Sequence, residues 1–137
     1  MGSAVAYFLK VLAPAADIAV IEPDRTYEFA STPRASGGAR RQFSCPENIE
    51  MSNYSIPFIE RADRELAVGD EPASVEWRRG GYLFIVGEAD LPVLRANAEV
   101  QRSPGVRADL PDADGLHERF PSMNLAGTAG GVHTPVD

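Results

Sequence analysis

The sequence lacks several features that would place it in familiar protein classes. Its 137 residues include a single cysteine, so no disulfide can form within the chain, and this composition suits a reducing compartment such as the cytoplasm. No apolar run reaches the roughly 18 residues that a membrane-spanning helix needs. Basic residues are also scarce, with 13 Lys and Arg against 20 Asp and Glu and a net charge of −7. We therefore predict a cytoplasmic protein with no membrane span and no nucleic-acid partner, because phosphate-binding surfaces are basic.

The composition that remains is that of an ordinary globular chain. Hydrophobic residues make up 44% and charged residues 24% of the sequence, both close to the average for folded domains. The length allows one domain with a hydrophobic core. The apolar N-terminus does not resemble a signal peptide, because Lys10 lies inside the apolar stretch instead of before it.

The first pattern that indicates chemistry lies at the N-terminus. Gly2 begins an apolar helix that ends before Pro14, and a β-branched run, Ile18–Ile21, then leads into Glu22. A glycine at the start of a helix, followed roughly 20 residues later by an acid at the end of a strand, is typical of the second half of a dinucleotide-binding unit. The strand and the two glycines that would come first in G-x-G-x-x-G are not in the sequence. We therefore expect an α/β fold with an incomplete Rossmann-like portion that lacks its first strand.

Two residues of this portion are candidates for nucleotide contacts. The carboxylate of Glu22 has the position that accepts hydrogen bonds from ribose hydroxyls, and Gly2 brings an unpaired backbone N–H to the pyrophosphate. The alternatives are an ordinary solvated acid at a strand end and an ordinary helix start.

The next candidate is a basic loop over residues 25–42. It carries a charge of +3 within an acidic chain, because four arginines face one acid: Arg25, Arg34, Arg40 and Arg41 against Glu28. Arginine binds phosphate through two parallel hydrogen bonds, and the small residues Ser36, Gly37 and Gly38 allow a ligand to approach the backbone. The loop therefore predicts a bound anion, with a solvated basic loop as the alternative.

The rest of the chain mixes helices and strands. We predict a helix over residues 47–66 that Pro57 kinks or splits, a helix over 90–102, and a short helix that Asp112 caps and that reaches Phe120. The expected strands are 75–78, 82–86, 106–110 and one near 130–133, with Gly80 and Gly81 joining the first two as a hairpin. We accordingly divide the chain into residues 1–73 and residues 74–137.

No residue pattern indicates a metal site or a catalytic nucleophile. Cys45 has no histidine near it in sequence, and the two histidines are far apart. The acids Asp109, Asp112 and Asp114 lack the spacing and terminal glutamate of a calcium loop. We expect these residues to be structural or solvent-facing.

Several stretches together resemble a known family. The resemblance is to the FAD-dependent oxidoreductases of the D-amino acid oxidase superfamily, in the branch that includes sarcosine oxidase, dimethylglycine dehydrogenase and FAD-dependent oxidoreductase domain proteins linked to respiratory complex I assembly. It rests on the order of these stretches along nearly the whole chain: Gly2–Leu9, Ile18–Glu22, Ser36–Phe43, Pro46–Ile49, Gly80–Leu83 and Glu118–Pro121.

The resemblance implies FAD as cofactor and oxidation of the C–N bond of a small amine or amino acid, with oxygen or a protein as electron acceptor. It also implies that residues 1–73 belong to the FAD-binding portion and residues 74–137 to part of an antiparallel α+β substrate domain. Gln42 and Tyr82 are candidates for the substrate side, and no catalytic residue is assigned. The implied cofactor contacts are Gly2, Glu22, Arg25, Ser36, Gly37, Gly38 and Arg40.

The resemblance covers only part of a complete enzyme of this kind, so we expect an N-terminal fragment that is inactive alone and binds FAD weakly or not at all. A non-catalytic assembly or scaffold protein of the complex I assembly type is the main alternative. A fragment without a cellular role of its own is the third.

Overall fold

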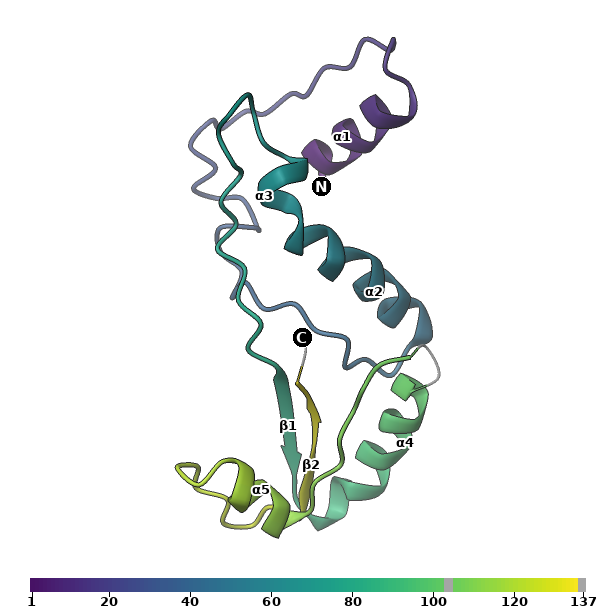
Figure 1. Cartoon of the computed structure of the whole chain (residues 1–137), viewed down its shortest axis with the longest axis vertical. Helices are drawn as coiled ribbons and strands as arrows, with labels where there is room; N and C mark the ends of the chain where they lie inside the picture. Colours follow the sequence, from purple (N-terminus) through teal and green to yellow (C-terminus); the bar gives the residue numbers. More distant parts are fainter. Residues whose placement is uncertain (103–104, 136–137) are drawn as a thin grey trace. The chain divides into compact units, whose positions relative to one another are not determined.

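The fold is described from a computed structural model of residues 1–102 and 105–135. The chain divides into two compact units, Met1–Gly38 and Ala39–Asp137, and each is described by itself (Figure 1). The boundary predicted between residues 73 and 74 separates a portion that binds FAD from a portion that binds substrate, and it stays a prediction.

The first unit contains one helix, α1 (Gly2–Leu12), followed by coil and turns. The helix ends where the Ala13 N–H donates to the Leu9 carbonyl at 2.8 Å, one residue before Pro14, which disfavours a helical conformation in the preceding residue. No residue of this unit is buried. Several apolar side chains, including Leu12 and Ile21, are largely exposed.

The strand predicted at Ile18–Ile21 is wrong for this structure. Residues 17–22 form no strand, because a strand needs hydrogen bonds to a neighbouring strand and no described segment supplies them. The helix predicted before it is confirmed.

The second unit is built on a two-stranded antiparallel sheet. Strands β1 (Tyr82–Val86) and β2 (Gly130–Thr134) pair from Tyr82↔Thr134 to Val86↔Gly130. The sequence predicts both strands, but it does not predict that they pair with each other. An antiparallel sheet was also expected for this part of the chain, and it is present.

Two other predicted strands do not form. Residues 75–78 are irregular, and the reason is visible in the backbone: Ser74 and Glu76 have positive φ angles of 39° and 50°, which are incompatible with a β-strand. The hairpin through Gly80 and Gly81 is therefore wrong. Over 106–110, only Asp109 makes a bridge, to His133 on the edge of β2 that faces away from β1.

The helices of this unit agree well with their sequence signals. Helix α2 (Pro46–Glu60) begins with proline at its first position, as favoured there, and continues through Pro57 to Glu60. The predicted helix is therefore split at Arg61 and not at Pro57, and α3 (Ala62–Glu65) follows. A short 3₁₀ turn, η1 (Glu88–Asp90), leads into α4 (Leu91–Arg102). Helix α5 (Ala113–Arg119) begins at Asp112, whose side chain accepts a hydrogen bond from the Gly115 N–H at 2.9 Å.

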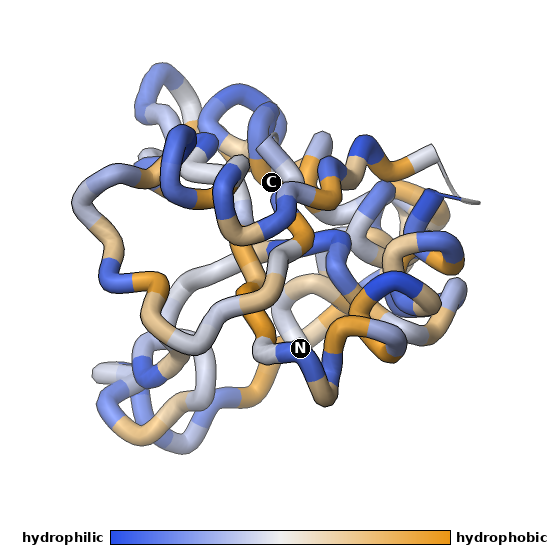
Figure 2. Tube along the Cα trace, turned by 90° about the horizontal axis from the view of Figure 1, so that it is seen from below, coloured by the Kyte–Doolittle hydropathy of each residue, from blue (hydrophilic) through white to orange (hydrophobic). Residues whose placement is uncertain are grey.

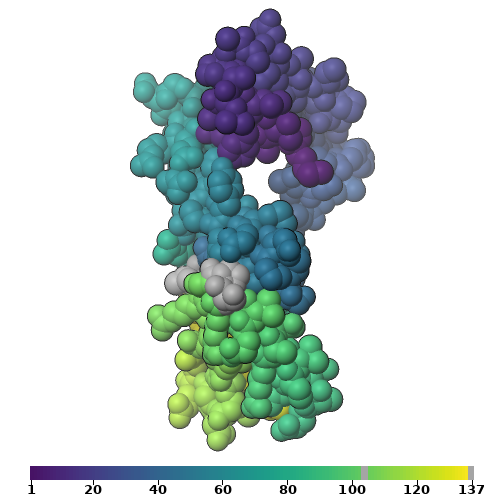
Figure 3. All heavy atoms as spheres, turned by 90° about the vertical axis from the view of Figure 1, so that its right-hand side faces the viewer, coloured from purple at the N-terminus to yellow at the C-terminus, as the bar shows by residue number. Residues whose placement is uncertain are grey.

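The hydrophobic core lies between α4 and the sheet. Leu94 and Ala98 of α4 pack with Ala108 and with Val132 of β2, and each large apolar side chain buried in this way contributes roughly 1.5–3 kcal/mol. On the other face of the sheet, Leu116 of α5 is fully buried and lies against Gly131. Helices α2 and α4 are in contact, and in the space-filling view the blue-teal atoms lie directly above the green ones (Figure 3).

Hydrophobic and hydrophilic stretches are interspersed along the chain (Figure 2). Among the described residues, no helix combines the length and the apolar character that crossing a membrane requires.

Candidate ligand-binding site

The predicted nucleotide contacts begin at the start of α1. Met1 is the N-cap and gives no side-chain hydrogen bond to the helix, and the first turn carries no acid. The first backbone N–H groups of α1 are therefore available to an anion. No atom outside the helix's own backbone lies within 4 Å of a Cβ placed on Gly2, so this end of the helix is not closely packed.

Glu22 lies in a turn of exposed polar residues. One of its carboxylate oxygens, Oε1, accepts a hydrogen bond from the Asp24 N–H at 3.0 Å. Asp24 in turn accepts from the Thr26 hydroxyl at 2.6 Å and from the Thr26 N–H, and these bonds lower the pKa of Asp24. The Glu22 side chain is thus oriented locally, while Oε2 has no recorded partner in the described residues. Arg25, which lies between Asp24 and Thr26, is exposed.

The glycine-rich part of the loop is open. Ser36, Gly37 and Gly38 are exposed and form no regular structure. Gly37 has a φ of 72°, which favours glycine, and no atom lies within 4 Å of its Cβ position.

The arginines of the basic loop make different contacts. Arg34 donates from Nε to the Glu28 carbonyl at 3.1 Å and lies over the Phe29 ring. Arg41 donates from Nε to Asn53 Oδ1 at 3.0 Å. Arg34 belongs to the first unit and Arg41 to the second.

Arg40 is placed among aromatic rings. Its guanidinium carbon lies 4.9 Å from the centre of the Phe43 ring, 5.6 Å from that of Tyr82 and 5.1 Å from that of Phe84. Such contacts hold a cation by electrostatic attraction to the ring face. No carboxylate of the described residues forms an ion pair with Arg40, so its charge is available to a ligand.

Gln42 joins the two strands of the sheet. Its amide nitrogen donates to the Tyr82 carbonyl at 3.1 Å and to the Val132 carbonyl at 3.2 Å, and the residue is only 4% exposed. Two of the predicted ligand residues, Gln42 and Tyr82, are thus in direct contact. The remaining polar atom, Gln42 Oε1, is buried without a hydrogen-bond partner in the described residues.

A second buried glutamine was not anticipated. Gln101 on α4 is also 4% exposed, its amide nitrogen donates to the Phe43 carbonyl at 3.4 Å, and its Oε1 also lacks a partner in that part of the chain. The spacing of Leu94, Ala98 and Gln101 places them on one face of the helix, so the sequence pattern could have identified Gln101 as buried.

These two glutamines and Arg40 line one pocket of about 260 Å³. We call it the glutamine pocket. Its walls are formed by the segment before α2, the sheet and α4, and none of the lining residues is an acid or a histidine. The lining residues are Arg40, Gln42, Phe43, Ser44, Phe84, Val86, Leu94, Asn97, Gln101 and Val132.

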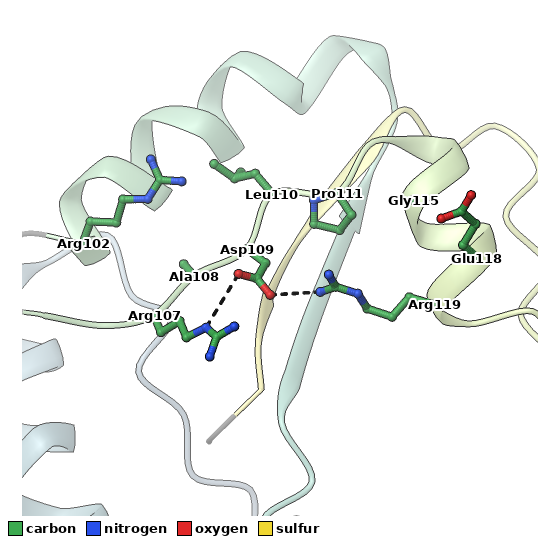
Figure 4. A pocket seen from close by; sticks show the side chains of 9 residues that line it. All are labelled: Arg102, Arg107, Ala108, Asp109, Leu110, Pro111, Gly115, Glu118 and Arg119. Atoms are coloured by element: carbon green, nitrogen blue, oxygen red, sulfur yellow. Dashed lines mark hydrogen bonds and ion pairs between the residues drawn. The ribbon is translucent and has the colours of Figure 1, made fainter.

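A larger and more open pocket, of about 840 Å³, lies beside α5 (Figure 4). Its charges are largely satisfied internally, because Asp109 pairs with Arg119 at 3.1 Å and with Arg107 at 4.0 Å, and Arg102 pairs with Glu99. Arg119 also lies 3.2 Å from His133 Nδ1. Burial, together with this guanidinium, lowers the pKa of His133.

The other candidates are structural. The Cys45 thiol donates to Glu47 Oε2 at 2.7 Å at the start of α2, and this bond lowers the pKa of Glu47. Glu60 accepts from Arg79 Nε at 2.6 Å, which lowers the pKa of Glu60. No group of three potential metal ligands occurs within residues 1–102 and 105–135.

Comparisons with known proteins place these residues in a family context. A family model described as "FAD dependent oxidoreductase" matches residues 1–137. The chain is 35% identical over 133 residues to "FAD-dependent oxidoreductase domain-containing protein 1" of Bos taurus, and 38% identical over 133 residues to that of Xenopus laevis. Each match covers 94% of this chain and 27% of the relative.

The fold is similar to part of a solved structure. The crystal structure of L-proline dehydrogenase from P. horikoshii matches with a TM-score of 0.63 at 21% sequence identity. The match covers 77% of this chain and 27% of that chain. The present chain thus spans about a quarter of the length of each protein that it matches.

Proposed function

The chain belongs to the family of FAD-dependent oxidoreductases, and on this premise we propose that it supplies part of the FAD-binding and substrate-binding surface of an enzyme that oxidises the C–N bond of a small amine or amino acid. The observation that carries the proposal is the family match over residues 1–137. The contacts of individual residues decide which part each would play.

The nucleotide half of FAD would bind to the first unit. The uncapped N-terminus of α1 at Gly2 offers backbone N–H groups to the pyrophosphate. Glu22 offers a carboxylate to the ribose, since only Oε1 has a recorded local bond. Arg25 adds positive charge in the same loop. In our proposal this unit is the incomplete Rossmann-like part of a larger FAD-binding domain.

The flavin half would lie near the glycine-rich loop. Ser36, Gly37 and Gly38 leave the backbone accessible, and Arg40 carries a positive charge without an ion-pair partner in the described chain. When bound, FAD would accept a hydride from the carbon beside an amine nitrogen. Gln42 and Tyr82 would position the substrate from the sheet. Apart from Gln42, residues 1–73 would then serve FAD and residues 74–137 the substrate.

A non-catalytic assembly or scaffold protein, of the type linked to respiratory complex I, is the second candidate. The composition of the glutamine pocket favours it, because no carboxylate or histidine lines that pocket to accept a proton from an amine. A cytoplasmic location, and oxygen or a protein as electron acceptor, remain predictions for either candidate.

The test is a titration of the chain with FAD, followed by flavin fluorescence anisotropy. We expect weak, saturable binding, because the first strand and two glycines of a complete fingerprint are not among its residues. Glu22→Ala should weaken binding about tenfold, as expected for loss of hydrogen bonds to a charged acceptor. Glu28→Ala, which removes another exposed acid a few residues further along the chain, is the matched control.

Equal affinity of the two variants would refute the ribose assignment. Anisotropy that does not change at any FAD concentration would refute FAD binding by this chain. A stoichiometric yellow protein on purification would contradict the expectation of weak binding.

A further inference from the structure

We propose that a proton-sensitive switch holds the C-terminal end of α5 against the sheet and releases it when His133 takes up a proton. The switch consists of three side chains, those of Asp109, Arg119 and His133, and we call it the His133 switch. They lie on three different segments: the chain before α5, α5 itself and β2. None of the three is assigned to FAD or to substrate, so the inference goes beyond the proposed function.

Arg119 joins the other two side chains at the end of α5. Its Nη1 atom donates to Asp109 Oδ2 at 3.1 Å and lies 3.2 Å from His133 Nδ1. Figure 4 shows the Arg119 side chain extending from α5 toward Asp109. The next residue, Phe120, meets the His133 ring edge to face, with the ring centres 5.4 Å apart. The end of α5 is therefore held to β2 through the His133 ring.

This contact requires a neutral His133. A guanidinium group donates hydrogen bonds and cannot accept them, so Nδ1 is the acceptor and the single ring proton lies on Nε2. A second proton would add to Nδ1. It would place two N–H donors and two positive charges 3.2 Å apart, and the Arg119 side chain would then leave the ring.

The surroundings of the ring keep the second proton off near neutral pH. Burial, and after it Arg119, lower the pKa of His133 from its ordinary 6.5, while Asp109 opposes them with a smaller effect. Arg107 lies 4.0 Å from Asp109 and partly offsets that carboxylate. Strand β1, which pairs with β2, carries no charged residue. The contact is therefore complete above pH 6.5 and breaks as the pH falls through the folded pKa.

The other contacts of these segments do not depend on that proton. The backbones of Asp109 and His133 exchange two hydrogen bonds, at 2.9 and 2.8 Å. Leu116, in the middle of α5, is fully buried, and Asp112 caps the first turn of the helix. Protonation therefore frees the last turn of α5 and leaves the sheet in place.

The switch also sets one wall of the pocket of about 840 Å³ beside α5. Gly115, Glu118 and Arg119 of α5 line this pocket, and Arg107 and Asp109 line it from the segment before α5 (Figure 4). Release of Arg119 would leave Asp109 with Arg107 as its ion-pair partner in the described chain. A change of pH would therefore alter both the shape and the charge of this pocket.

The experiment measures hydrogen exchange of the whole 137-residue chain by NMR at about pH 7.5 and about pH 5.5, corrected for intrinsic exchange rates. The reporter is the Phe120 amide, which donates to the Leu116 carbonyl at 2.8 Å. Its protection should fall at least about fivefold at the lower pH, as expected for loss of a hydrogen bond to a charged group. The His133 amide should stay protected at both pH values, because the sheet remains formed.

His133→Gln removes the titration and keeps a side-chain oxygen that can accept a hydrogen bond from Arg119. The Phe120 amide should therefore keep its protection at both pH values in this variant. His117→Gln makes the same substitution at an exposed position of α5 and is the matched control.

Arg119→Met tests the coupling from the other side. It removes one of the causes that lower the pKa of His133, so the NMR titration of the His133 Cε1–H signal should move up by at least about half a pH unit. The amide shifts of β1 and β2 report whether the variant stays folded. Arg107→Met removes another guanidinium from the same pocket, and it should move the titration less.

Four results would overturn the proposal. They are equal Phe120 protection at both pH values in the unaltered chain, joint loss of protection at Phe120 and His133, an equal effect of His133→Gln and His117→Gln, and an unchanged His133 titration in folded Arg119→Met. The second would mean that the sheet unfolds as a whole, and the third that another group controls the release. FAD binding is measured separately, so failure of the proposed function leaves these outcomes unaffected.

Discussion

At the scale of single residues, Gly81 shows how one backbone angle controls the start of a strand. Its φ is 71°, and a Cβ added there would lie 3.0 Å from the Thr134 carbonyl oxygen and 3.1 Å from His133 Nε2. The chain therefore needs glycine at this position to enter β1 beside β2.

Gly81→Ala should destabilise the chain by about 1–3 kcal/mol, because both the positive φ and the close contact oppose a side chain. Urea unfolding followed by circular dichroism measures this. Gly80→Ala is the matched control, since no atom lies within 4 Å of its Cβ position. Equal midpoints for the two variants would contradict the argument.

His133 makes the stability depend on pH. Burial and the Arg119 guanidinium lower its pKa from the ordinary 6.5, against a smaller opposite effect of Asp109. The folded state therefore binds fewer protons at this site than the unfolded state does, so stability is present above pH 6.5 and is lost as the pH falls through the folded pKa.

We expect the urea midpoint to fall between about pH 7.5 and pH 5.5, and to fall less in His133→Gln. His117→Gln, which removes the other histidine of the chain, is the matched control. An unchanged profile in His133→Gln would show that other groups cause the dependence.

At the scale of elements, the first turn of α5 depends on one side chain. Asp112→Ala removes the acceptor of the Gly115 N–H and should cost about 1 kcal/mol, the usual effect of losing an N-cap. Thermal unfolding measures it, with Asp114→Ala in the same turn as the control. If both variants lose the same stability, helix charge rather than capping is responsible.

The elements also show which predictions sequence patterns support. The start of α5 could be predicted because its cap lies within three residues of its partner, and α1, α2 and α4 follow from local apolar spacing. Strand pairing could not be predicted, because β1 pairs with a strand more than 40 residues away. The irregular backbone before β1 could not be predicted either, because the composition does not reveal the positive φ angles of Ser74 and Glu76. The burial of Gln101 follows from its spacing on α4, but its hydrogen bond to the Phe43 carbonyl depends on what α4 packs against.

At the scale of the whole molecule, burial is confined to one unit. Every buried residue of the described chain lies within residues 39–137, including the core around Leu94 and Val132. The first unit, with the candidate nucleotide residues Gly2 and Glu22, contains none. Helical hydrogen bonds without buried apolar contacts have little stability of their own.

Hydrogen exchange should therefore separate the two units. We expect the amides of α1 to exchange within seconds and those of α4 and β2 to be protected by orders of magnitude, with mass spectrometry as the measurement. The loops of the second unit serve as an internal control for exposed amides. Protection of α1 equal to that of α4 would contradict this view of the first unit.

The amide of Gln42 also bears on how the sheet is assembled. It donates to one carbonyl of β1 and one of β2 at the same time, and both acceptors are in place only when Tyr82 faces Thr134. Sliding β2 by a single residue would turn its side chains to the opposite face and would leave a buried donor of Gln42 without its acceptor. A residue outside the sheet thus favours the native strand register, and it disfavours shifted pairings of two short strands, one of which begins with two glycines.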